Sequence, residues 1–166
     1  MNVGALVRPN FTVSTRRRWS AIPLRLIVGY GFIAHGYAKV ANGPDHFAAS
    51  LQALGVPAPH VMALATIGFE LLGGLAVLLG AYLPLISLPL AVILVVAVIT
   101  VHLPYGFSSI KLRAVTPAGP EFGPPGYETD LLYLAALTTL VLGGPGPLSM
   151  ALTMPHRRGS GAAEDA

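Results

Sequence analysis

The sequence predicts an all-α membrane protein, folded as an antiparallel bundle of four transmembrane helices. The chain has 166 residues, of which 54% are hydrophobic and only 10% are charged, and its mean hydropathy is +0.68. A soluble domain usually has about 25% charged residues. A membrane span needs about 20 mostly apolar residues. Four windows meet this length, at about residues 21–41, 60–81, 83–103 and 128–148.

The windows leave room for one membrane domain, residues 21–150, between two tails. Residues 1–20 and 151–166 contain many small or charged residues and no apolar period, so we expect an N-terminal cytoplasmic tail and a disordered C-terminal tail. Arg16–Arg18 before an apolar run also fits a signal peptide. We disfavour that alternative because Arg25 interrupts the apolar core and three further windows follow.

Basic residues set the expected orientation. Arg8 and Arg16–Arg18 precede the first window, and Arg157–Arg158 follow the fourth. The positive-inside rule therefore places both termini in the cytoplasm. Lys111 and Arg113, between the third and fourth windows, oppose this orientation but are outnumbered.

The connections differ in length and in character. His46–Gly55 reads as a short amphipathic helix at the outer interface. Gly80–Pro84 is so short that it forces the second and third windows into a helical hairpin, with Pro84 at a helix start and Pro89 at a kink. The longest connection, Pro104–Gly126, contains nine prolines and glycines. We expect it to be irregular, because loops of this length are usually functional or mobile.

Glu70 lies in the middle of the second window, where a charged group costs roughly 2.5 to 3.5 kcal/mol and therefore needs a partner. On a helical wheel, Arg25, His35 and Lys39 fall on one face of the first window, beside two glycines that allow close helix packing. We predict an ion pair between Arg25 and Glu70, with His35 as the second choice. This pair could belong to a functional site. The alternative is that it is purely structural, a buried ion pair that fixes helix register and does no chemistry.

Further polar residues lie at the outer ends of the windows. Lys39 closes the first window, His102 closes the third, and Glu128 with Asp130 opens the fourth. Their common depth predicts a polar pocket beneath the long loop. The bland alternatives are a lysine that snorkels to the interface, a histidine bonded to a neighbouring helix, and two acids that cap a helix.

Several kinds of chemistry are excluded or disfavoured. The chain has no cysteine, which removes disulfides, thiolate nucleophiles, iron–sulfur ligation and cysteine-based zinc sites. We expect no metal site, and no motif assigns a catalytic residue. Nucleic-acid binding is not expected either, because the basic residues are short flanks of the apolar windows.

The sequence resembles the DoxX family of small four-helix bacterial membrane proteins. The resemblance extends from Arg25 to Ser149 and rests on these segments: Arg25, Gly36–Lys39, Phe47–Pro57, Phe69–Gly74, His102–Phe107, Gly126–Glu128, Leu131–Tyr133 and Gly144–Ser149. It implies a multi-pass protein of the bacterial plasma membrane with a role in a redox system, near the quinone pool or in oxidative-stress defence. Met150 and Ser108–Ser109 depart from the family pattern, which puts loop-specific functions in question.

Three functions follow as hypotheses. In the first, the chain is a subunit of a membrane oxidoreductase, with redox protein partners and further copies of itself, and the polar residues bind a quinone. These residues are Arg25, His35, Lys39, Glu70, His102 and Glu128. In the second, the bundle binds haem, which is disfavoured because His35 and His102 differ in depth by about 10 Å. In the third, it is a scaffold or small-solute carrier with structural charges.

Overall fold

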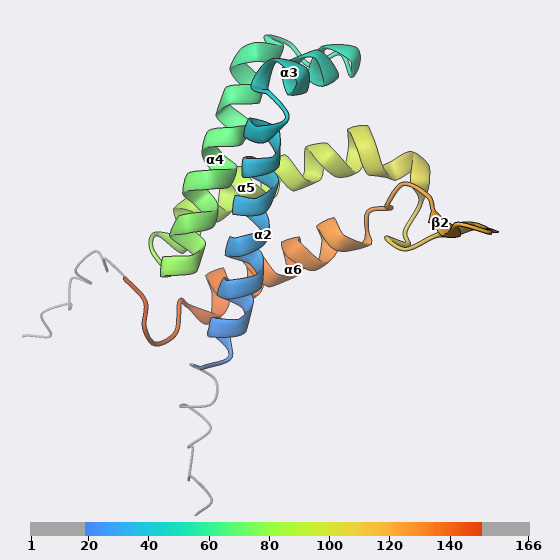
Figure 1. Ribbon diagram of the computed structural model, residues 1–166. Coiled ribbons are helices and arrows are strands. Elements are labelled where there is room, and N and C mark those ends of the chain that lie inside the picture. The colour runs from blue at the N-terminus through green and yellow to red at the C-terminus, as the bar shows by residue number, and fades with distance from the viewer. Residues whose placement is uncertain (1–18, 151–166) are drawn as a thin grey trace, which may run out of the picture.

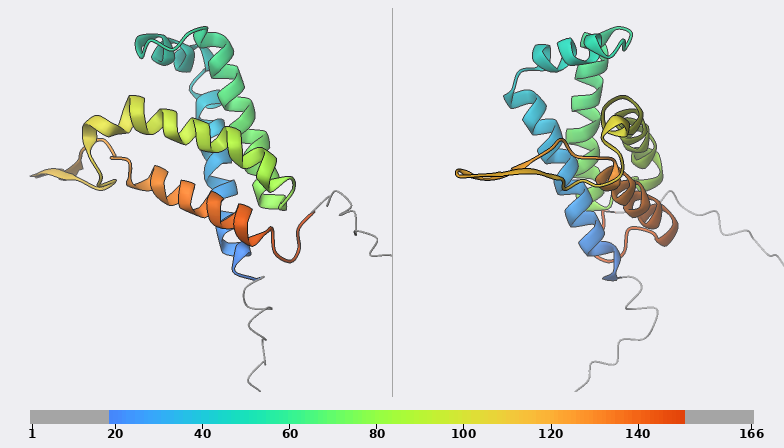
Figure 2. Two further views of the ribbon diagram at one scale, coloured as in Figure 1. Left: turned by 180° about the vertical axis from the view of Figure 1, so that it is seen from behind. Right: turned by 90° about the vertical axis from the view of Figure 1, so that its right-hand side faces the viewer.

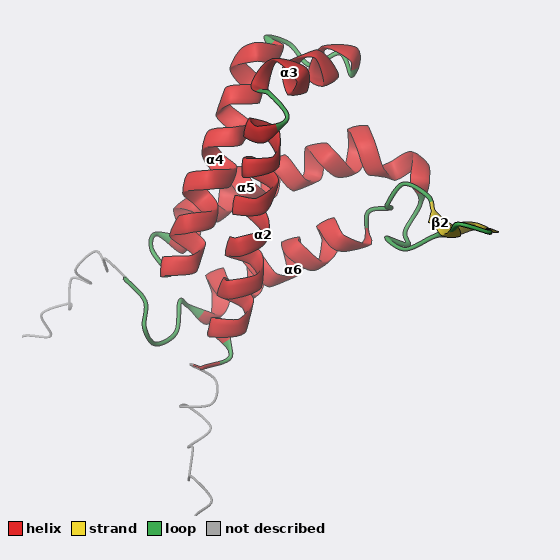
Figure 3. Ribbon diagram, in the orientation of Figure 1, coloured by secondary structure: helices red, strands yellow, loops and turns green. Residues whose placement is uncertain are grey.

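The computed structural model describes residues 19–150, which are mostly helical (Figures 1 and 3). The elements, in chain order, are α2 (Ala21–Ala41), α3 (Pro44–Ala53), α4 (Pro59–Leu79), α5 (Leu83–Ala97), a π-helical turn (Val98–His102), a 3-10 turn (Leu103–Tyr105), β1 (Leu112–Thr116), β2 (Gly119–Phe122) and α6 (Glu128–Gly143). The predicted tails lie outside the described residues, apart from residues 19 and 20.

The four long helices form two pairs. Helices α2 and α4 lie side by side along their length, and α5 and α6 form a second pair that crosses the first at one end and diverges from it at the other (Figures 1 and 2). Glycines allow the backbones of α2 and α4 to touch, since a Cβ on Gly29 would lie 2.7 Å from the carbonyl oxygen of Gly74. The small-residue faces predicted from the sequence therefore do pack together.

The core lies where the two pairs cross. Each long helix contributes to it, through Val28 and Phe32 of α2, Val77 of α4, Leu90 of α5 and Leu140 of α6, which are all at most 2% exposed. The apolar contacts at the crossing point thus hold the two helix pairs together.

Two helices in the described part of the chain are long and apolar enough to cross a membrane. They are α4, with a mean hydropathy of 2.0, and the helix from Leu83 to Tyr105, with a mean of 2.7. Helix α6 has only 16 residues, which is about 24 Å against a hydrocarbon core of about 30 Å. The structure thus shows the helical class and two of the four predicted spans.

The predicted end of the fourth window is corrected, and the helix of the third window is less regular than expected. The last helix ends at Gly143 rather than at residue 148, because Gly144 and Gly146 adopt φ values of +80° and +72° and alternate with two prolines. The third helix changes at Val98 from α-helical to π-helical bonding before the chain turns. Composition alone does not indicate these two changes, because apolar residues continue past both points.

The long connection is also more ordered than predicted. Strands β1 and β2 pair as an antiparallel hairpin within it, and a register irregularity lies between Leu112 and Ala114. By contrast, the short helix after the first window is confirmed as α3, and the tight turn after α4 is confirmed with Gly80 at a φ of +66°. This left-handed conformation suits glycine at a helix end.

Candidate functional site

The buried carboxylate of Glu70 is paired with Lys39. The Nζ atom of Lys39 lies 2.8 Å from Oε1 and 2.7 Å from Oε2 of Glu70, so the ammonium donates to both oxygens. The Glu70 side chain is 5% exposed and the Lys39 side chain 22%. Lys39 Nζ also lies 5.1 Å from the centre of the Phe47 ring, within the range of a cation–π contact. The charge buried on α4 is thereby satisfied by Lys39 of α2, whose ammonium in turn contacts α3.

The predicted pair of Glu70 with Arg25 is wrong, and His35, the second choice, gives way to Lys39, which is bonded to both carboxylate oxygens. The helix face was predicted correctly, because Arg25 and Lys39 both face α4, but the register was not. A Cβ on Gly36 would lie 3.1 Å from Cβ of Glu70, which places these two residues level with each other. Arg25 precedes Gly36 by eleven residues, or about 16 Å along α2, which is too far for an ion pair.

Arg25 instead binds backbone carbonyls at the crossing of the helix pairs. Its Nε donates to the oxygens of Val77 and Leu78, at 3.3 and 3.2 Å, and its Nη2 approaches Leu78 O at 2.6 Å. The other bonds go to Pro145 O, Pro147 O and Leu148 O, at 3.0, 3.1 and 3.1 Å. A cation at the C-terminal carbonyls of α4 also opposes the helix dipole. Arg25 is thus a structural clamp between α4 and the segment after α6.

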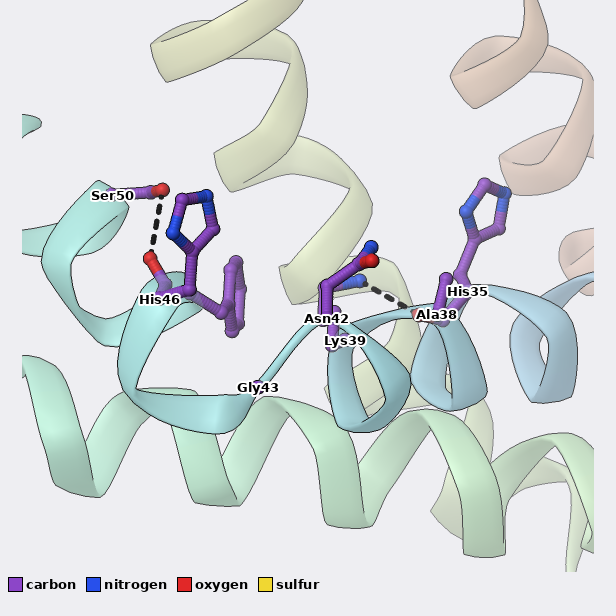
Figure 4. A pocket seen from close by; sticks show the side chains of 8 residues that line it. His35, Ala38, Lys39, Asn42, Gly43, His46 and Ser50 are labelled. Atoms are coloured by element: carbon purple, nitrogen blue, oxygen red, sulfur yellow. Dashed lines mark hydrogen bonds between the residues drawn. The ribbon is translucent and has the colours of Figure 1, made fainter.

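A polar pocket opens beside the Lys39–Glu70 pair, between the end of α2 and α3 (Figure 4). It has a volume of about 200 Å³ and is lined by His35, Ala38, Lys39, Asn42, Gly43, His46, Phe47 and Ser50. The side chains of His35, Asn42 and His46 project to the same side of the two helices in Figure 4. Lys39 therefore links the pocket to the buried carboxylate behind it.

His102 and Asp130 form a second polar pair, between the π-helical turn and the first turn of α6. His102 Nδ1 lies 2.6 Å from Asp130 Oδ2, and the side chains are 25% and 9% exposed. An ionised carboxylate only accepts hydrogen bonds, so Nδ1 of His102 is the donor in this pair. The sequence placed Asp130 among the outer polar residues, with helix capping as the alternative, and did not pair it with His102. π-Helical turns often occur at functional sites.

Glu128 holds the long loop against the start of α6. Its Oε2 accepts a hydrogen bond from the Ser109 backbone N–H at 3.0 Å, and the Ser109 hydroxyl lies 2.8 Å from that of Thr129. Lys39 is therefore not grouped with His102 and Glu128 as the prediction of a single outer pocket required. Lys39 lines the pocket on α2 and α3, whose lining includes neither His102 nor Glu128.

The geometry bears on two cofactor classes. Within residues 19–150, no group of three or more His, Asp or Glu side chains is placed to bind a metal ion. His35 lines the pocket on α2 while His102 is bonded to Asp130 on the other helix pair. The pocket instead offers imidazole, amide, hydroxyl and ammonium groups, which suit a ligand with polar oxygens.

Comparison with known proteins identifies the family. The DoxX family model matches residues 20–103. The chain belongs to the DoxX family. It is also 31% identical, over 142 residues, to the uncharacterized membrane protein Rv3486 of Mycobacterium tuberculosis, and the match covers 79% of this chain and 78% of the relative. No solved structure matches the chain.

The DoxX match contains most of the polar residues singled out above. Arg25, His35, Lys39, Glu70 and His102 all lie within residues 20–103, whereas Asp130 lies beyond them. The family model therefore covers the complete Lys39–Glu70 pair but only one partner of the His102–Asp130 pair. Together with the two apolar helices, the family and the relative identify a membrane protein.

Proposed function

We propose that this DoxX-family protein is an integral subunit of a redox system in the bacterial plasma membrane, which binds a quinone-like ligand in the pocket on α2 and α3. The observation that carries the proposal is the Lys39–Glu70 ion pair beside that pocket. Intramembrane carboxylates are costly and usually mark ion, proton or substrate sites. The electrons come from a partner protein with a redox centre, because this chain has no cysteine to exchange them.

The membrane arrangement is part of the proposal. All four long helices cross the bilayer, with both termini cytoplasmic, and two of them, α4 and the helix that begins with α5, are long and apolar enough to span it by themselves. In this topology α3 and the β-hairpin lie on the outer side. The crossing point with Arg25 lies toward the cytoplasm, and the pocket lies near the outer surface.

The chemistry follows from the charges. Reduction of a quinone to a quinol adds two electrons and two protons to its two carbonyl oxygens, so the ligand needs both hydrogen-bond donors and a proton supply. Lys39 donates a hydrogen bond to one ligand oxygen, while Glu70 balances the positive charge of Lys39. Asn42 or His46 also binds the ligand in this pocket. Protons enter from the exposed side, where His46 reaches the surface.

The test measures quinone bound to the full-length protein purified gently from its native membranes. We expect about one quinone per chain in the wild type and a loss of roughly tenfold in Glu70→Gln and Lys39→Gln, which corresponds to about 1.4 kcal/mol of binding free energy. Glu121→Gln is the matched control for Glu70→Gln, because it is the same substitution at an exposed residue of the hairpin. Folding is checked by thermal unfolding of each variant.

A second function, a membrane scaffold or small-solute carrier, is favoured by one observation. Arg25 binds only backbone carbonyls in the described residues, and Glu70 has both oxygens occupied by Lys39, so each charge already has a structural role. A wild-type protein without quinone, together with a Glu70→Gln variant that only loses thermal stability, would establish this second function in place of the first.

A further inference from the structure

The β-hairpin has one apolar face and one polar face. Its register pairs Leu112 with Phe122 and Val115 with Pro120, whereas Ala114 pairs with Glu121 and Thr116 with Gly119. Directly paired residues point to the same side of a sheet, and neighbours along a strand alternate. Val115, Pro120 and Phe122 therefore share a face with Leu112, and Glu121 lies on the other.

The apolar face has no cover within the described chain. Leu112 is 59% exposed, Val115 77% and Phe122 60%. The exposed apolar surface continues into the loop before β1, where Ile110 is 77% and Phe107 56% exposed. An isolated two-stranded hairpin is marginal in water and needs a covered apolar face to be stable. The face must therefore be buried against something outside residues 19–150.

The residues around the apolar face are those typical of a bilayer interface. The hairpin projects from the end of the α5–α6 pair, shortly after the more apolar of the two candidate membrane helices in the described residues (Figure 2). Lys111 and Arg113 flank the apolar residues, and Tyr105 lies at the same end, 43% exposed. Aromatic side chains at the end of a membrane helix, next to cations, are the composition of a bilayer interface. Cations there attract anionic headgroups.

We propose that the hairpin lies flat on the bilayer surface, with Leu112, Val115 and Phe122 inserted among the lipids and with Lys111 and Arg113 at anionic headgroups. It is a surface anchor for the diverging end of the α5–α6 pair. The polar face with Glu121 and Thr116 points to water. The anchor fixes the end of the pair that carries His102 and Asp130, and it is independent of any ligand in the pocket on α2 and α3.

The test places a single tryptophan on either face of the hairpin in the full-length protein. Trp19, the only native tryptophan, is replaced by Phe, and Phe122→Trp is compared with Glu121→Trp. The proteins are reconstituted in vesicles of phosphatidylcholine with phosphatidylglycerol, and emission is quenched by brominated lipids or by aqueous iodide. We expect bromolipid quenching of Phe122→Trp to be at least about twofold that of Glu121→Trp, and iodide to show the reverse order.

Two results would overturn the proposal. Iodide quenching of Phe122→Trp as strong as that of Glu121→Trp would place the face in water. Protection of Phe122→Trp from both quenchers would instead show that a protein, either a second copy or a partner, covers it. The headgroup contact is tested by Lys111→Gln with Arg113→Gln. These two changes are made in the Phe122→Trp protein. We expect them to lower bromolipid quenching of that tryptophan when phosphatidylglycerol is present and to leave it unchanged in pure phosphatidylcholine.

Discussion

Replacing Arg25 is the most direct test of the clamp at the helix crossing. Arg25→Met keeps much of the side-chain volume and removes every donor. The guanidinium contacts five carbonyl oxygens, on Val77, Leu78, Pro145, Pro147 and Leu148. A hydrogen bond to a charged group contributes about 1.5–3 kcal/mol. The sum is reduced because the bonds share donors and because burying the cation itself is costly.

We expect Arg25→Met to lower the free energy of unfolding by about 3–5 kcal/mol, the range for breaking a buried charged network from one side. Arg25→Lys should lose about 2 kcal/mol, because a lysine ammonium donates from one point and cannot reach both α4 and the segment after α6. The measurement is unfolding of the protein in mixed micelles by increasing SDS, followed by far-ultraviolet circular dichroism.

The matched control is Arg113→Met, which makes the same change on the exposed hairpin and should alter stability by less than about 0.5 kcal/mol. If Arg25→Met lost no more than the control, the carbonyl clamp would be refuted as a source of stability. If Arg25→Lys were as stable as the wild type, the bridging role of the guanidinium would be refuted.

Three further predictions concern contacts between helices and within the long loop. Gly31→Ala should lower stability by about 2 kcal/mol, since its methyl group would overlap the Tyr133 hydroxyl, and adding Tyr133→Phe should restore part of the loss in the same unfolding assay. A double-mutant cycle of His102→Ala and Asp130→Ala should give a coupling energy of about 1–2 kcal/mol, and a value near zero would show that the pair does not join α5 to α6. Gly126→Ala should cost more than about 2 kcal/mol, because a Cβ there would meet three loop carbonyl oxygens; a neutral variant in thermal unfolding would contradict the close approach.

The polar network shows how far pattern alone reaches. The sequence identified Glu70 as a group that needs a partner and gave the face of α2 that supplies one. It did not identify Lys39 as that partner, because a helical wheel gives the angle of a residue and not its height against another helix. The height is set by where Gly29 meets Gly74 and Gly36 meets Glu70.

The ends of the elements show the same division. Gly144 and Gly146, each next to a proline, end α6 although apolar residues continue after it. The carbonyl oxygens of Pro145 and Pro147 then accept hydrogen bonds from Arg25. The glycine–proline pattern is visible in the sequence, but the sequence does not show that its carbonyl groups bind Arg25. The hairpin was missed because its prolines and glycines outweighed two short strands, which are stable only where an apolar face can be covered.

The sequence by itself determined the class of this protein, since composition and the length of apolar runs depend on each residue alone: a helical membrane protein, with a short helix after the first window and a tight turn before α5. Only the tertiary structure decided which charges meet. Lys39 reaches Glu70, His102 reaches Asp130 and Arg25 reaches carbonyls alone. Those contacts depend on the register and crossing of helices far apart in the chain, which no local pattern of residues specifies.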